Sequence, residues 1–268
     1  MGKIKLKLFL IVFSAIILLS FKQIYTYKPV ENNSFGPGEH IEYRVHYGII
    51  NAAEAVVHVE NKIQKVNNRP CYVVKVTGRT TGAFDLVSKV RDTWQSYIDT
   101  TAMIPQQFYT NKREGGYKNI EKVIFDHENE IANRYDLDNK KEKNSYKVPK
   151  NVQDVVSGYY YLRTFDFKNM KVGQSIMVKA FFEGDIIEMK MKYAGKDKIR
   201  TKFGTAKVFK MNPILPNNDF FEDENSIRIW VSDDENKIPL KIEVDLKIGA
   251  ISMDIKKYHG LKNPLIFN

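Results

Sequence analysis

The stretch IRIWVSDDENKIPLKIEVDLKIG, Ile227 to Gly249, decides the fold class of this chain. Apolar and polar side chains alternate on both sides of the acidic row SDDENK, residues 232–237. The apolar positions are Ile227, Ile229 and Val231 before the row, and Ile238, Leu240, Ile242, Val244, Leu246 and Ile248 after it. A period of two is typical of strands with one buried face, and Asp and Asn favour turns because their side chains bond nearby backbone. The stretch therefore predicts an antiparallel hairpin with the acidic row at its tip.

The acidic row also contains the oxygen-bearing side chains that calcium prefers. A calcium-binding loop needs glycine at its sixth position and glutamate at its twelfth. Counted from Asp234, those positions are Pro239 and Asp245, so the hairpin interpretation is the better one. No zinc-binding spacing occurs among the histidines, which are His40, His46, His58, His127 and His259. We expect no metal and no other cofactor.

The period-two pattern recurs through most of the chain. Runs such as HIEYRVHYGII (40–50), CYVVKVTGRT (71–80) and QSIMVKAFFE (174–183) are separated by Gly, Asn and Asp. Good turn candidates lie around Gly184 and Gly204. Short runs this close together indicate antiparallel hairpins. We predict a mainly β fold, a long curved antiparallel sheet or incomplete β-barrel packed on one α-helix.

One segment, NVQDVVSGYYYLRTFD (151–166), has helical spacing, with Asn151 as the expected N-cap. Arg163 continues the apolar stripe of this helix, and an arginine in that position needs either a partner or a route to water. It can snorkel at the helix C-terminus, or it can meet a carboxylate of the sheet. A further short helical turn is expected in LVSKVRDT (86–93). The stripe consists of Val152, Val155, Val156, Tyr159 and Tyr160.

The strand-like run VRDTWQSYID (90–99) places Asp92 on the same face as Trp94 and Ile98. A carboxylate among apolar neighbours must be paired or neutral. The expected partners are Arg163 and Arg79. Such a pair would fix the helix on the sheet, or its arginine would bind a ligand.

The run KREGGYKN (112–119) carries Glu114 and Tyr117 around paired glycines. The glycines predict a tight turn or bulge, and they would also let a ligand approach the backbone closely. Asp92 and Glu114 are the carboxylates we consider for an alternative function, hydrolysis of an envelope glycan. That chemistry needs two carboxyl groups about 5–9.5 Å apart. No nucleophile elbow or phosphate loop occurs, so we assign no catalytic residue.

The N-terminus reads as a targeting segment. Lys3, Lys5 and Lys7 precede an apolar run, Leu8 to Leu19. Its length suits a signal peptide better than a membrane span, which needs about 20 apolar residues. We predict a signal peptide over residues 1–22, a polar leader over 23–34 and a single antiparallel β domain over 35–268. An uncleaved N-terminal anchor is the alternative.

The single cysteine, Cys71, cannot form a disulfide within the chain. It also lies too far from the targeting segment to receive a lipid at a new N-terminus, so the protein is not expected to be a lipoprotein. We expect an exported protein, periplasmic or associated with the outer envelope. Membrane contact is expected only through the N-terminal segment, if it is not cleaved.

The formal net charge is +10, and without the four lysines among residues 1–26 it falls to +6. Basic and acidic residues are interspersed, unlike the basic stripe of a nucleic-acid-binding protein. We therefore expect no nucleic acid, while attraction to an anionic lipid or glycan remains open. The aromatic run Tyr159–Tyr161 fills a core or lines a groove for a lipid or glycan.

Several segments taken together resemble a family of exported bacterial proteins known as domain of unknown function 3108. The most specific are the hairpin stretch 229–255 and the run R-D-x-x-x-S-Y-I-D at 91–99. Ala53 departs from the glycine expected there in that family. The resemblance implies a signal peptide, an antiparallel β architecture and an envelope location in Gram-negative bacteria, and it supplies no catalytic residues.

We therefore expect a non-enzymatic envelope protein that binds a hydrophobic or glycan envelope component, or a partner protein. The candidate ligand-binding or ion-pair residues are Arg79, Asp92, Trp94, Glu114, Tyr117, Tyr160 and Arg163.

Overall fold

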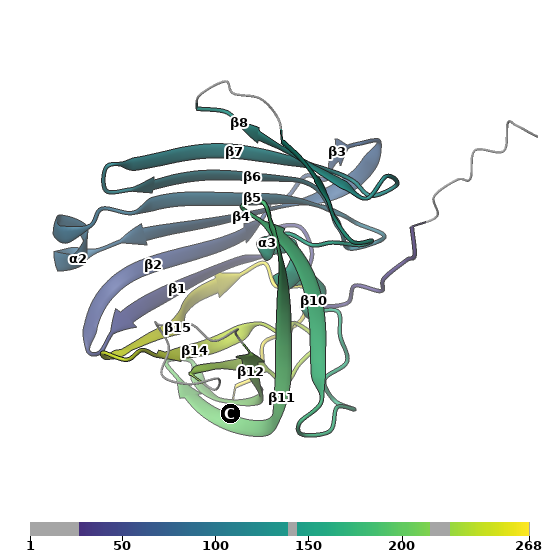
Figure 1. Ribbon diagram of the computed structural model, residues 1–268. Coiled ribbons are helices and arrows are strands. Elements are labelled where there is room, and N and C mark those ends of the chain that lie inside the picture. The colour runs from purple at the N-terminus through teal and green to yellow at the C-terminus, as the bar shows by residue number, and fades with distance from the viewer. Residues whose placement is uncertain (1–26, 139–143, 215–225, 268) are drawn as a thin grey trace, which may run out of the picture.

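A computed structural model of the chain describes residues 27–138, 144–214 and 226–267 (Figure 1). The predicted signal peptide, residues 1–22, lies outside this part. The described strands form one 15-stranded sheet in which every pairing is antiparallel. The strands are β1 (His40–Tyr47), β2 (Ile50–Val59), β3 (Gln64–Val66), β4 (Arg69–Thr80), β5 (Arg91–Asp99), β6 (Pro105–Glu114), β7 (Tyr117–Asp126), β8 (Ile131–Asp136), β9 (Asn144–Lys147), β10 (Ser175–Phe182), β11 (Asp185–Thr201), β12 (Gly204–Ile214), β13 (Ile227–Ser232), β14 (Pro239–Asp245) and β15 (Ala250–His259).

The sheet curls into an incomplete barrel, which confirms the predicted fold class. Its strand order runs β10-β11-β12-β13-β14-β15-β1-β2-β4-β5-β6-β7-β8-β9, with β3 paired to β4. The two end strands of this order, β9 and β10, approach one another through side chains, since the rings of Tyr146 and Phe181 lie 5.2 Å apart. No backbone ladder joins β9 to β10 within the described residues, so this side-chain contact forms the seam of the barrel.

The predicted hairpin is present, with β13 paired to β14 and the acidic row at its tip. The predicted turns around Gly184 and Gly204 join β10 to β11 and β11 to β12. The glycine pair of residues 115–116 forms the turn between β6 and β7. The run 40–50 is not one strand, because a turn at Gly48 and Ile49 divides it between β1 and β2.

The helix α3 (Val155–Leu162) is shorter than predicted and begins later. Its N-cap is Asp154 rather than Asn151, because the Asp154 carboxylate accepts from the backbone N–H of Val156 and Ser157 in a capping box. Asn151 lies before the helix with a φ of 56°. A second, shorter helix, α2 (Gly82–Val87), overlaps the predicted turn at 86–93 only at Leu86 and Val87, and β5 begins at Arg91.

The main core lies between α3 and the inner face of the sheet (Figure 1). Phe35, Ile98, Tyr160 and Phe181 are among its fully buried members. A second apolar cluster packs against β11, β12 and β13 and consists of Phe167, Tyr193, Phe209, Met211 and Val231. The C-terminal end of α3 faces the boundary between the two clusters.

Candidate functional site

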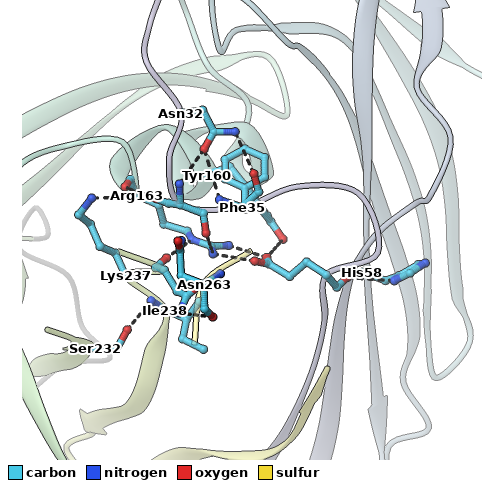
Figure 2. Close-up of polar contacts among 12 residues, drawn as sticks. Asn32, Phe35, His58, Tyr160, Arg163, Ser232, Lys237, Ile238 and Asn263 are labelled. Carbon is cyan, nitrogen blue, oxygen red and sulfur yellow. Dashed lines mark hydrogen bonds and ion pairs between the residues drawn. The ribbon is translucent and has the colours of Figure 1, made fainter. Parts of the chain in front are cut away.

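The centre of the molecule holds a buried ion pair between Arg163, the C-cap of α3, and Glu39, which directly precedes β1 (Figure 2). Two parallel contacts, Nη1 to Oε1 at 2.6 Å and Nη2 to Oε2 at 2.7 Å, make the pair bidentate. The Tyr160 hydroxyl donates to the same Oε1 at 2.8 Å. The Arg163 and Glu39 side chains are only 2% and 0% exposed, so water does not screen the pair.

The remaining donors of Arg163 reach backbone carbonyls from two other segments. Nε donates to the Asn236 carbonyl at 2.9 Å and Nη2 to the Ser34 carbonyl at 3.1 Å. The guanidinium also lies 5.3 Å from the Phe35 ring centroid. One side chain therefore connects the N-terminal segment, α3 and the β13–β14 tip, and its hydrogen-bonding capacity is largely met.

The acidic row shapes the tip that contributes to this centre. The Asp234 carboxylate accepts from the Ser232 hydroxyl at 2.9 Å and from the Asn236 N–H at 2.8 Å. It also accepts from the Lys237 N–H at 3.3 Å, and Lys237 adopts a φ of 49°. This bending turns Asn236 and Lys237 into the protein, where both are buried.

The expectation that Arg163 snorkels to water is wrong. Its alternative, a pair with a carboxylate, is what the structure shows, but the partner is Glu39, directly before β1, and not Asp92. The helical stripe indicated that Arg163 needs a partner, but Glu39 stands just before the alternating run that begins at His40, and no pattern marked it as that partner. Arg79, the other expected partner of Asp92, pairs instead with Glu54 at 2.6 Å, and its side chain is 59% exposed.

The structure brings Asp92 together with Glu114, at the ends of the adjacent strands β5 and β6. The Asp92 carboxylate accepts from the backbone N–H of Arg113 at 2.9 Å. Burial and then the neighbouring Asp92 charge raise the pKa of Glu114, which also shares a hydrogen bond with Asp92. Tyr117 lies across the following turn and is 56% exposed.

This carboxylate pair lacks the geometry of a glycosidase. The two carboxyl groups lie close enough to interact directly, whereas glycosidases hold theirs about 5–9.5 Å apart across the substrate. A pocket between β6, β7 and β10 is lined by Lys112, Glu121 and Glu183 but by neither Asp92 nor Glu114. Trp94, on the same face as Asp92, packs in the core with its ring 6.2 Å from Phe182.

An apolar pocket lies between the two hydrophobic clusters, beside the buried ion pair. Its free volume is about 50 Å³. Apart from Arg163 and Lys237, the lining is aromatic or aliphatic and consists of Tyr159, Leu162, Phe167, Met191, Met211, Ile229, Val231 and Pro239.

Lys237 is an unusual member of this lining because it is 8% exposed and has no carboxylate within ion-pair distance in the described chain. Its Nζ reaches only the Ser34 hydroxyl, at 3.4 Å. Burial lowers the pKa of Lys237. The Tyr159 hydroxyl is also buried there, near Tyr43 and Arg163 but without hydrogen-bond geometry to either, and burial raises its pKa to about 12. The pocket thus has a buried cation in a largely apolar lining, and one lining residue, Tyr159, has a buried hydroxyl without a hydrogen-bond partner among the described residues.

A larger cleft of about 330 Å³ lies where the β11–β12 turn approaches β1 and β15. Its polar lining is mainly cationic and includes Arg44, His46, Arg200, Lys202 and Lys256, with Asp254 as its carboxylate.

Three histidines that are far apart in the sequence stand side by side across β2, β1 and β15. The ring of His40 lies 5.5 Å from that of His58 and 4.4 Å from that of His259. Among the described residues, however, no group of three or more His, Cys, Asp and Glu side chains is arranged to hold a metal.

An antiparallel sheet curled around one helix, with its barrel left open at a side-chain seam, defines a β-barrel-like protein. The chain belongs to the family described as protein of unknown function DUF3108, whose model matches residues 42–256. The expected family membership is thereby confirmed. No curated protein matches the chain.

Two solved structures are similar. A β-barrel-like protein of domain of unknown function DUF1849 from Brucella abortus is 10% identical, with a TM-score of 0.54 over 84% of this chain and 99% of that one. This likeness supports the fold alone. A candidate lipoprotein from Parabacteroides distasonis is also 10% identical, but its TM-score of 0.34 over 87% and 100% of the two chains is too low for an argument. In the part of the chain that the structure describes, no helix is long and apolar enough to span a membrane.

Proposed function

We propose that this protein is exported to the cell envelope and there binds an amphipathic anion, an acyl chain with a carboxylate or phosphate head. The observation that carries the proposal is Lys237, a buried cation that forms no ion pair with any residue the structure describes and that stands at the edge of an apolar pocket. A buried charge is costly unless it is paired, and a ligand anion would provide the pair. Export is supported by the N-terminal lysines followed by an apolar run.

The two parts of such a ligand match the two parts of the pocket. The acidic head would accept hydrogen bonds from Lys237 Nζ and from the Tyr159 hydroxyl, neither of which has a carboxylate partner. The chain would lie against Leu162, Met191 and Ile229, the apolar and partly exposed residues of the lining.

The present volume of about 50 Å³ admits only a short part of an acyl chain, since one water occupies about 30 Å³ of liquid. Binding therefore requires side chains to move. Met191 and Met211 line the pocket, and methionine is the apolar residue that adapts its shape most readily.

The test is a titration of the exported protein, purified from its own envelope and stripped of lipid, with the fluorescent fatty acid cis-parinaric acid at neutral pH. We expect saturable binding that Lys237→Met weakens about tenfold or more, because a charge-assisted bond is lost. The matched control is Lys207→Met, which removes the charge of an exposed lysine from the neighbouring strand β12.

Equal binding by both variants, or no binding by the parent protein, would contradict the proposal. A parinaryl alcohol should bind the parent more weakly than the acid, because it lacks the charge that Lys237 would meet. Native mass spectrometry of protein that has not been stripped should show a bound acidic lipid.

One observation favours a second candidate, an acidic glycan. The cationic cleft of about 330 Å³ has room for a sugar ring with a phosphate or carboxylate group, which Arg44 and Arg200 would face. Arg44→Ala together with Arg200→Ala should abolish binding of a phosphorylated sugar while leaving parinarate binding intact. A phosphorylated sugar that binds the parent and the double variant equally would remove this candidate.

A further inference from the structure

The most exposed large apolar side chains of the described chain gather at one end of the sheet. Four exceed 80% exposure, namely Ile49 at 99%, Leu86 at 91%, Val87 at 88% and Ile248 at 81%. Ile49 lies in the β1–β2 turn, Leu86 and Val87 in α2, and Ile248 in the β14–β15 turn. We call these four residues the apolar tip.

Specific contacts hold the three segments of the apolar tip together. The Tyr47 hydroxyl donates to the Ile248 carbonyl at 3.0 Å, and the rings of Tyr47 and Phe84 lie 6.1 Å apart. The Thr81 N–H donates to the Ala52 carbonyl at 2.9 Å, which fixes α2 beside β2. In Figure 1 α2 and the β1–β2 turn lie at the left, on the side away from β10 and β11.

One of these segments depends on glycine. Gly249 has a φ of 77°, and a Cβ there would lie 2.6 Å from the Tyr47 hydroxyl oxygen. The turn that projects Ile248 outward therefore favours glycine at this position, since a side chain there would be strained and would displace Tyr47. The exposure of Ile248 is built into the turn rather than resulting from a loose segment.

The charged side chains in the segments of the apolar tip leave a surplus of positive charge. Asp85 is paired with Arg91 through Nη1 to Oδ1 at 2.6 Å. The other ionised side chains in segments 47–51, 82–90 and 246–249 are Lys89 and Lys247, and neither forms an ion pair within the described chain. The exposed apolar side chains are thus accompanied by two free cations.

We infer that the apolar tip docks on the surface of an anionic lipid bilayer. Apolar side chains that project from turns and are flanked by lysines match the boundary between acyl chains and acidic headgroups. The four side chains stand on three separate segments, two turns and α2, and line none of the pockets described above, which fits a deformable, fluid surface better than a small ligand. This inference goes beyond the proposed lipid binding, concerns a different surface, and differs from the expectation that only the N-terminal segment contacts a membrane.

The test attaches an environment-sensitive fluorophore to the exported protein, purified from the envelope in its processed form, at Ile49→Cys or Leu86→Cys. The native Cys71 is fully buried and does not compete for the label. Val172→Cys is the matched control, since Val172 is 72% exposed in the loop before β10. Each labelled protein is mixed with vesicles of phosphatidylglycerol and phosphatidylethanolamine, or of phosphatidylcholine alone.

We expect a blue shift and protection from an aqueous quencher at positions 49 and 86, but not at 172, with the phosphatidylglycerol vesicles. Ile49→Ser combined with Leu86→Ser should weaken partitioning about tenfold or more. Lys89→Gln with Lys247→Gln should reduce the preference for anionic vesicles about tenfold, with parinarate binding unchanged.

Three results would overturn the inference. The first is the absence of a lipid-dependent shift at positions 49 and 86, and the second is an equal shift at position 172, which indicates non-specific adsorption. The third is a shift at positions 49 and 86 that grows with protein concentration without vesicles, because it assigns the apolar tip to contact between two copies of the chain.

Discussion

The carboxylate of Glu39 and the guanidinium of Arg163, 124 residues apart in the sequence, form a bidentate ion pair at the centre of the barrel. Removing one partner leaves the other charged and buried, which costs about 3–5 kcal/mol. Glu39→Gln should therefore lower the free energy of unfolding by roughly that amount, measured by urea denaturation.

The control for this prediction is Glu54→Gln, which removes the partner of the exposed Arg79 and should cost less than about 1 kcal/mol. Adding Arg163→Met to Glu39→Gln should restore part of the loss, because the uncompensated charge is gone. A Glu39→Gln protein as stable as the Glu54→Gln protein would refute a central role for the pair.

Asp154 predicts a dependence of stability on pH. Burial raises the pKa of its carboxyl from 3.8 to about 6, even though Ser96 donates to it at 2.6 Å. Between these values the folded state keeps a proton that the unfolded state has lost, so stability falls as pH rises from about 4 to about 6. Relative to Asp154→Asn, the parent protein should lose up to about 3 kcal/mol over that window in urea denaturation at stepped pH. A difference that stays constant or grows in the opposite direction would show that the carboxyl is ionised when folded.

The proximity of Asp92 and Glu114 predicts that the pKa of Glu114 depends on the charge of Asp92. The neighbouring Asp92 charge contributes to the raised pKa of Glu114, although burial contributes more. Asp92→Asn should lower the pKa of Glu114, which NMR titration of the side-chain carboxyl carbon measures. Asp85→Asn, which disrupts the separate pair with Arg91, should leave the pKa of Glu114 unchanged. Because Asp92 is only partly buried, Asp92→Ala should destabilise the fold much less than Glu39→Gln does.

The burial of Cys71 predicts that its thiol is protected from reagents in the folded protein. It is 0% exposed in β4, and burial raises its pKa to about 12, so almost no thiolate forms at neutral pH. A thiol reagent should react with the native protein only at the rate of unfolding, whereas Ile49→Cys should react at once. Rapid reaction of Cys71 under native conditions would contradict its burial.

The hairpin pattern predicted much of the fold because alternation is a local property. Ile229 and Leu240 follow a period of two, and so do most of the other strands, whereas β9 lies in a lysine-rich run that has the composition of a loop. The sequence also predicted helix α3, but it placed the start too early, since Asp154 rather than Asn151 makes the capping contacts.

The candidate site was less predictable because its parts meet only in three dimensions. The position of Arg163 in an apolar helical stripe predicted that it needs a partner, but nothing in the sequence around Glu39 marks it as that partner. Lys237 belongs to a row that looks like a solvated turn, and only the hydrogen bonds to Asp234 turn it inward. Ile49 belongs to a run whose alternation predicts one continuous strand, so the sequence did not predict that Ile49 projects from a turn.

The length of β4 sets a separation between the two ends of the molecule. Tyr27 stacks on Arg69 at the start of this strand, 4.3 Å from guanidinium carbon to ring centroid, and α2 follows directly after its end at Thr80. Twelve extended residues span about 36 Å at about 3.3 Å per residue. A molecule tethered through the segment before Tyr27 would therefore carry its apolar tip at the far end of β4, about 36 Å from Arg69, facing away from the tethered end.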